Sequence, residues 1–186
     1  HNARDRRNSR AEEEAVFERM NRLTWDIIEE AFSSRVITPG VTRTSDVVWW
    51  MRQRVADYGL TTWFQPSVDV QRRADSGAVP GDDPVIQKGD VLHCDFGITA
   101  MRLNTDTQQH AYVLRRGESA APEGLRRGMA TANRLQDLLM ANFAVGRSGN
   151  EVLAATRKAA LAEGIEPSIY THPLGFHGHA AGATSL

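Results

Sequence analysis

Apolar side chains recur at helical spacing near the start of the chain. Intervals of four, three and four residues separate Val16, Met20, Leu23 and Ile27. This spacing places the four side chains on one face, and it predicts an amphipathic helix over about residues 10–34. Residues 1–9 precede the pattern, and we predict that they form a flexible or linker start.

Helix and strand patterns then alternate along the chain. Thr44, Ser45 and Asp46 can cap a second helix, and Gly59 is well placed to end it. The remaining expected elements are strands over 60–70, 91–98 and 104–114, a loop over 71–90, helices over 122–143 and 148–163, and a strand with a glycine-rich turn over 165–182.

The order helix, turn, helix, strand occurs twice. Val47 and Gly59 correspond to Val152 and Gly164, each 105 residues further along the chain. The pattern predicts the α/β (α+β) class, with residues 1–186 forming one domain of two similar halves. A binding site is then expected between the halves.

Composition narrows the range of functions. The chain has 186 residues, 41% of them apolar, which is enough for one globular core. A net charge of -1 predicts no nucleic-acid partner and no membrane surface as partner. The single cysteine, Cys94, excludes an internal disulfide framework and favours a reducing compartment, so we expect the protein in the cytoplasm.

Two aspartates eleven residues apart stand out in "HCDFGITAMRLNTDT", residues 93–107. If the chain reverses symmetrically about Ala100 and Met101, Asp95 lies directly opposite Asp106 in a hairpin. Such a pair would repel, so it would share a proton, as in acid protease chemistry, or hold a divalent cation. The alternative is that both aspartates lie at an exposed strand end and have no function.

Histidines cluster near the end of the chain, in "THPLGFHGHAAG". His172, His177 and His179 fall within eight residues and are surrounded by small residues. Neutral imidazole accompanies carboxylates around zinc, manganese, iron or cobalt. The alternative is a histidine-rich loop without a function.

These motifs resemble those of the pita-bread metallopeptidases, which include methionine aminopeptidase, aminopeptidase P and prolidase, with creatinase as a non-metal relative. "CDFG" followed by "TDT" is similar to the family's Asp-x-Gly strand and second aspartate, and "HGHAAG" is similar to its His-x-x-Gly segment. The resemblance implies two pseudo-symmetric halves around a mostly antiparallel curved sheet.

The resemblance also implies a site with two divalent ions, manganese, cobalt, zinc or iron, and a bridging hydroxide. Asp95 would bind one ion, Asp106 would bridge both, and His179 would complete the first site, with His177 as its close rival. His172 resembles a substrate-side histidine of the proline-specific members. The expected substrate is a short peptide cleaved at its N-terminal bond, with Xaa-Pro the favoured type, and a homodimer is possible.

Two departures from the family pattern leave alternatives open. The two glutamate ligands of the family would follow the metal histidine beyond Leu186, so we expect that the chain as given is C-terminally incomplete and inactive. The family's upstream substrate histidine is replaced by Gly77 and Ala78. A pseudoenzyme or peptide-binding module is therefore the main alternative, and a creatinase-like amidinohydrolase is a further one.

Overall fold

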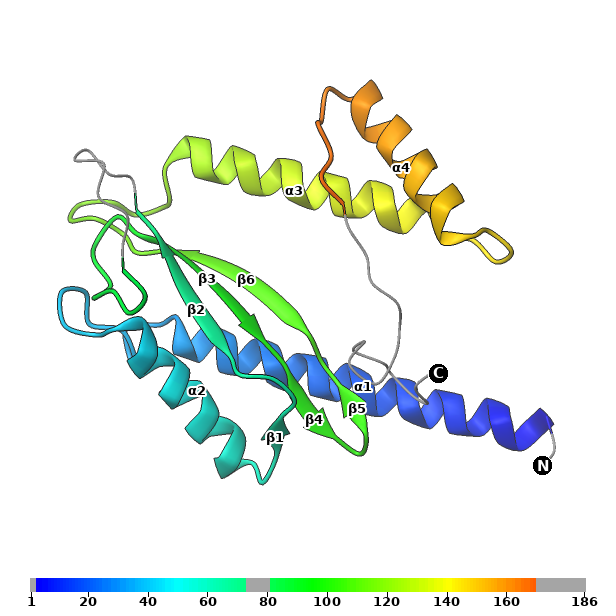
Figure 1. The fold of residues 1–186 in the computed structure, drawn as a ribbon, viewed down its shortest axis with the longest axis horizontal. Coiled ribbons are helices and arrows are strands. Elements are labelled where there is room, and N and C mark those ends of the chain that lie inside the picture. Colours follow the sequence, from blue (N-terminus) through cyan, green and yellow to red (C-terminus); the bar gives the residue numbers. More distant parts are fainter. Residues whose placement is uncertain (1–2, 73–80, 170–186) are drawn as a thin grey trace. The chain divides into compact units, whose positions relative to one another are not determined.

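The structure is a computed structural model that describes residues 3–72 and 81–169. Its residues fall into two compact units, the first up to Ser119 and the second starting at Ala120. Of the described elements, the first unit contains α1, α2 and the six strands, and the second contains α3 and α4 (Figure 1). Among the described residues, no helix combines the length and apolar character needed to cross a membrane.

The first unit begins with the two predicted helices. α1 runs from Ala3 to Ala31, and α2 runs from Thr44 to Asp57. The predicted flexible start over residues 3–9 thus forms the first turns of α1, because that segment contains no proline or glycine that would stop a helix. α2 ends before Gly59, whose φ of +66° lies in the left-handed region, as predicted.

Two antiparallel sheets follow from the predicted strand regions. β2 (Ser67–Gln71), β3 (Val91–Phe96) and β6 (Thr107–Tyr112) form one sheet in the order β2-β3-β6. β1 (Thr61–Thr62), β4 (Ile98–Ala100) and β5 (Leu103–Asn104) form the other in the order β1-β4-β5. The strand predicted over 60–70 is interrupted before Pro66, which has no backbone N–H for a ladder.

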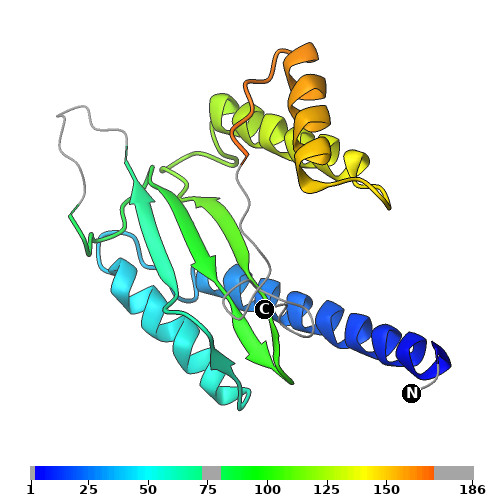
Figure 2. The same cartoon turned by 45° about the vertical axis from the view of Figure 1, so that its right-hand side comes forward.

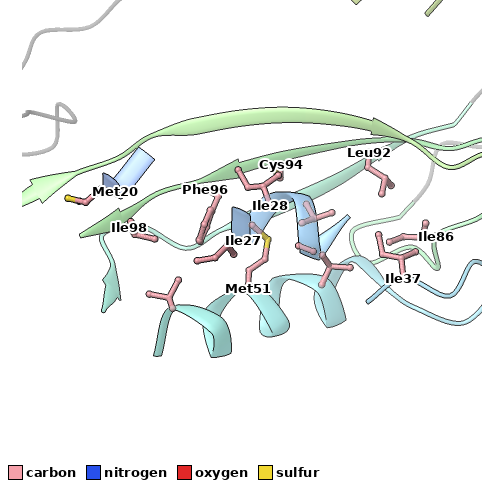
Figure 3. Packing of buried hydrophobic residues seen from close by; sticks show 14 of the residues in the cluster. Met20, Ile27, Ile28, Ile37, Met51, Ile86, Leu92, Cys94, Phe96 and Ile98 are labelled. Carbon is pink, nitrogen blue, oxygen red and sulfur yellow. The ribbon is translucent and has the colours of Figure 1, made fainter. Parts of the chain in front are cut away.

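The core lies between one face of the β2-β3-β6 sheet and the two helices α1 and α2 (Figures 1 and 2). Residues of β3 alternate between buried and half-buried, so Leu92, Cys94 and Phe96 point into this core (Figure 3). The predicted alternation is confirmed: His93 and Asp95 lie on the opposite face. The sheet therefore has one apolar and one polar face.

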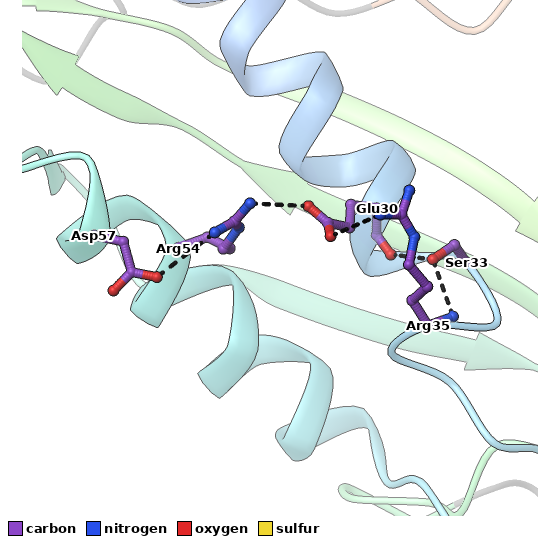
Figure 4. Close-up of polar contacts among 5 residues, drawn as sticks. All are labelled: Glu30, Ser33, Arg35, Arg54 and Asp57. Carbon is purple, nitrogen blue, oxygen red and sulfur yellow. Dashed lines mark hydrogen bonds and ion pairs between the residues drawn. The ribbon is translucent and has the colours of Figure 1, made fainter.

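A group of charged side chains joins the end of α1 to α2. Arg54 Nη2 lies 3.2 Å from Glu30 Oε2, and Arg35 Nη1 lies 3.4 Å from Glu30 Oε1 (Figure 4). Arg54 also lies 3.8 Å from Asp57 on its own helix. Because these groups are partly exposed, the ion pairs add little to the free energy of folding, and their main effect is on how α1 and α2 are oriented.

The second unit contains a helix whose cap and buried positions correspond to those of α2, 105 residues further along the chain. It consists of α3 (Glu123–Asn142) and α4 (Gly149–Ala162). The N-cap residues Arg43 and Ser148 each donate their backbone N–H to an acidic side chain three residues on, at 2.8 and 2.7 Å. Buried positions correspond in the same way, as the pairs Val47 and Val152, Met51 and Thr156, and Val55 and Ala160. This correspondence supports the predicted internal repeat.

The end of the second unit differs from the expectation. The strand with a glycine-rich turn was predicted over residues 165–182. Residues 165–169 follow α4 without strand geometry, and the rest of that segment lies outside the described residues.

Candidate metal site

The polar face of the β2-β3-β6 sheet carries the predicted aspartate pair. Two of the cross-strand rows on this face contain or adjoin Asp95. In the first row Ser67, Asp95 and Gln108 lie opposite one another, and in the next Asp69, His93 and His110 do. The alternation of the strands that buries Cys94 thus brings titratable and amide side chains together on the other side.

The register of the hairpin differs from the prediction. The turn consists of Met101 and Arg102, with φ values of 51° and 67°, and Ala100 pairs with Leu103. Positive φ at both central residues is typical of a type I′ turn, which matches the twist of the strands. Asp95 therefore lies opposite Gln108, and the predicted direct pairing with Asp106 is wrong.

The shift amounts to two residues on the partner strand, so Asp106 stays on the same face as Asp95. Extending the register places Asp106 diagonally next to Asp95, across from Gly97. Asp106 follows β5 and precedes β6, and its side chain is exposed. The two carboxylates remain neighbours even though the predicted register was not correct.

The carboxyl group of Asp106 is close enough to that of Asp95 to influence the protonation of Asp95. The pKa of Asp95 is raised from 3.8 to about 6, first by burial and then by the hydrogen bond with Asp106 and the charge of Asp106. The nearby His93 acts in the opposite direction. A carboxyl whose proton is held this strongly is destabilised as an anion, and a cation beside it would relieve that destabilisation.

One oxygen of Asp95 has no hydrogen-bond partner within the described part of the chain. Asp95 Oδ1 is buried and has no hydrogen-bond partner among the described residues. Its other oxygen, Oδ2, accepts a hydrogen bond of 3.5 Å from Gln108 Nε2. A buried oxygen without a donor, next to a second carboxylate, fits the ligand preference of a hard divalent cation.

Gln108 and His93 belong to the surroundings of Asp95, and the sequence predicted neither of them as part of the metal site. The Gln108 amide bridges Asp95 and His93, whose Nε2 lies 3.0 Å from Gln108 Oε1. His93 Nδ1 lies 3.5 Å from Asp69 Oδ2, and the His93 and His110 rings are 4.9 Å apart. If the hairpin is centred on residues 101 and 102, Gln108 lies opposite Asp95 and His110 lies opposite His93.

The predicted histidines cannot be placed. His172, His177 and His179 lie outside the described residues, so their roles stay predictions. Within residues 3–72 and 81–169, no group of three or more His, Cys, Asp or Glu side chains could hold a metal ion. The described part of the chain thus supplies two carboxylates of a site that needs further ligands.

Cys94 has a structural role in this sheet. It is fully buried in the core, and burial raises the pKa of its thiol to about 11. The thiol is therefore protonated at neutral pH and is not a nucleophile.

Comparisons with known proteins decide the family. The model of metallopeptidase family M24 matches residues 15–184. The chain belongs to metallopeptidase family M24. No curated protein sequence matches the chain.

Similar solved structures agree with the family assignment. Prolidase from Pyrococcus furiosus is 18% identical with a TM-score of 0.63, over 82% of this chain and 43% of that one. An X-Pro aminopeptidase from Thermotoga maritima is 19% identical with a TM-score of 0.59, over 81% and 42%. A putative aminopeptidase P from Bacillus anthracis is 15% identical with a TM-score of 0.56, over 94% and 43%. The predicted pita-bread fold is confirmed, and this M24 chain spans less than half the length of these structures.

Proposed function

We propose that this chain carries part of the active site of a metal-dependent aminopeptidase or dipeptidase that hydrolyses an N-terminal peptide bond. The observation that carries the proposal is the Asp95 and Asp106 pair on the polar sheet face of an M24 chain. One Asp95 oxygen is buried without a partner among the described residues, which supports a cation as the missing partner.

In this proposal the ionised carboxylates of Asp95 and Asp106 hold two divalent ions, with His179 or His177 as a further ligand. Divalent ions lower the pKa of water and polarise a peptide carbonyl, which is the chemistry that peptide hydrolysis needs. The Gln108 amide donates a hydrogen bond to Asp95 Oδ2, and this bond helps to fix the orientation of the Asp95 carboxylate on the polar face of the sheet. His172 and the other of the two histidines would contact the peptide.

We propose a short peptide of the Xaa-Pro type as substrate, and manganese, cobalt, zinc or iron as the metal. An X-Pro aminopeptidase and a prolidase are among the similar structures, and this likeness supports the proposal only through the shared fold. A homodimer in the cytoplasm is the corresponding expectation for the whole protein.

The test is metal analysis of the intact protein together with hydrolysis of Xaa-Pro and Met-Xaa peptides. Asp106→Ala removes one proposed ligand, and we expect it to lose bound metal and hydrolysis while remaining folded. Asp26→Ala, which removes an exposed aspartate of α1, is the matched control and should keep both. Metal-independent cleavage, or no cleavage by a folded, metal-loaded protein, would contradict the proposal.

A pseudoenzyme or peptide-binding module is the second candidate. The observation that favours it is the presence of Gly77 and Ala78 where the family pattern has a substrate histidine. This candidate predicts that the metal-loaded protein binds Xaa-Pro peptides without cleaving them. Hydrolysis of creatine in place of peptides would instead support a creatinase-like amidinohydrolase.

A further inference from the structure

Thr105, the residue directly before Asp106, is held at every polar atom. Its side chain is completely buried. Its backbone N–H donates to Ile98 O at 3.0 Å, and its carbonyl accepts from Trp63 Nε1 at 2.8 Å. Because the Thr105 carbonyl carbon is bonded to the nitrogen of Asp106, these contacts fix the peptide plane from which Asp106 projects.

The Thr105 hydroxyl connects this turn to α1. Thr24 Oγ1 lies 2.8 Å from Thr105 Oγ1, and both residues are completely buried. Thr24 donates its own proton to Met20 O at 2.8 Å, so the proton between the two hydroxyls belongs to Thr105. Ile98 N donates to Thr105 Oγ1 at 3.0 Å and completes a directed chain from β4 to α1.

The surroundings of Thr105 leave little space for rearrangement. A Cβ added at Gly97 would collide with Thr105 O and would lie 2.5 Å from Trp63 Nε1. Trp63 and Phe64 stand edge to face beside it, with ring centroids 4.6 Å apart. The backbone before Asp106 is thus packed against an aromatic pair and is connected to α1 through the Thr105 hydroxyl.

Asp106 itself is exposed and belongs to neither adjoining strand. We propose that Thr24 is a positioning residue, which holds Asp106 at the metal site through the Thr105 hydroxyl. The inference rests on the proposed function, since it assigns Asp106 as a metal ligand. It adds a contribution of α1, a helix on the far side of the sheet from the polar face, to the geometry of the site.

The chain offers a matched pair of threonines for the test. Thr156 in α4 is also completely buried and donates to the carbonyl four residues earlier, Val152 O, at 2.8 Å. It belongs to the other unit. Thr24→Val and Thr156→Val therefore remove the same intrahelical hydrogen bond, and only the first leaves the Thr105 hydroxyl without its acceptor.

The experiment measures Mn²⁺ and Co²⁺ affinity by calorimetry, the visible absorption of bound Co²⁺ and thermal unfolding, all with the intact protein. We expect Thr24→Val to weaken metal affinity by about tenfold or more and to change the Co²⁺ spectrum. Thr156→Val should lower the unfolding temperature but keep the affinity of the wild type. Thr24→Ser, which restores the hydroxyl, should return affinity and spectrum to wild-type values.

Wild-type affinity in a folded Thr24→Val, or an equal loss in Thr156→Val, would overturn the inference while leaving the proposed function intact. If the wild type binds neither ion, the proposed function fails, and the inference fails with it. If Thr24→Val does not fold, Thr24→Ala removes the same hydroxyl without placing a second β-branched methyl group in the helix. An affinity loss in that variant supports the inference, and wild-type affinity overturns it.

Discussion

Asp95 lies directly across the β3 and β6 ladder from Gln108, and the Gln108 amide nitrogen is 3.5 Å from Asp95 Oδ2. The oxygen of the same amide, Gln108 Oε1, lies 3.0 Å from His93 Nε2. A side chain that can donate on one side and accept on the other thus orients one carboxylate of the proposed metal pair.

Gln108→Met keeps the volume of this side chain and removes both polar contacts. We expect metal affinity to fall roughly tenfold, because Asp95 loses the donor that orients it. Gln71→Met is the control, since Gln71 is an exposed residue of the same face but pairs with Val91. Titration calorimetry with Mn²⁺ measures both, and equal affinities in the two variants would contradict the role of Gln108.

Asp95→Asn should stabilise the metal-free protein while abolishing metal binding. The raised pKa of Asp95 means that its ionised form is destabilised at neutral pH by burial and by Asp106. Because Asp95 is partly exposed, solvent screening reduces this effect, and removing the charge should increase the free energy of unfolding by about 1 kcal/mol at pH 7. Chemical denaturation in the presence of a chelator checks this, and a loss of stability in the variant would refute it.

The pH dependence of stability should differ between wild type and Asp95→Asn. In the metal-free protein the Asp95 pKa of about 6 lies above the ordinary value of 3.8, so the folded state binds more protons between these values. The favourable contribution of Asp95 is therefore full below about pH 4 and is lost as pH rises through about 6. The difference in free energy of unfolding between the two proteins should shrink as pH falls from 7 to 4. A constant difference would argue against a raised pKa of Asp95.

The affinity for divalent metal ions should depend on the protonation state of Asp95. Because a divalent ion must displace the proton on Asp95, affinity should be level above about pH 7 and fall about tenfold per unit well below pH 6. Calorimetric titrations with Mn²⁺ between pH 5 and 8 measure this. A pH-independent affinity would show that Asp95 does not contact the ion.

Gly97→Ala should destabilise the first unit and weaken metal binding. The added methyl group would collide with Thr105 O and would approach Trp63 and Phe64, at an expected cost of about 2–3 kcal/mol. Gly128→Ala is the control, since nothing lies near its Cβ position inside α3 and alanine favours a helix, by up to about 1 kcal/mol. Thermal unfolding should therefore shift in opposite directions in the two variants.

The sequence by itself determined the elements and the face on which the chemistry lies. Helical spacing and cap residues predicted α1 to α4, and Gly59 and Gly164 marked two helix ends of an internal repeat. Period-two alternation assigned Asp95 to the polar face and Cys94 to the core. These features are local, because each depends only on residues close along the chain.

The tertiary structure decided the register of the hairpin and the support of the site. A turn at Met101 and Arg102 shifts the pairing by two residues, which keeps each side chain on its face but exchanges Asp106 for Gln108 as the partner of Asp95. The bond between Thr24 and Thr105 joins residues 81 positions apart, and no spacing in the sequence encodes it. Such contacts arise only when a helix packs against a sheet, because packing brings together groups that the chain itself keeps far apart.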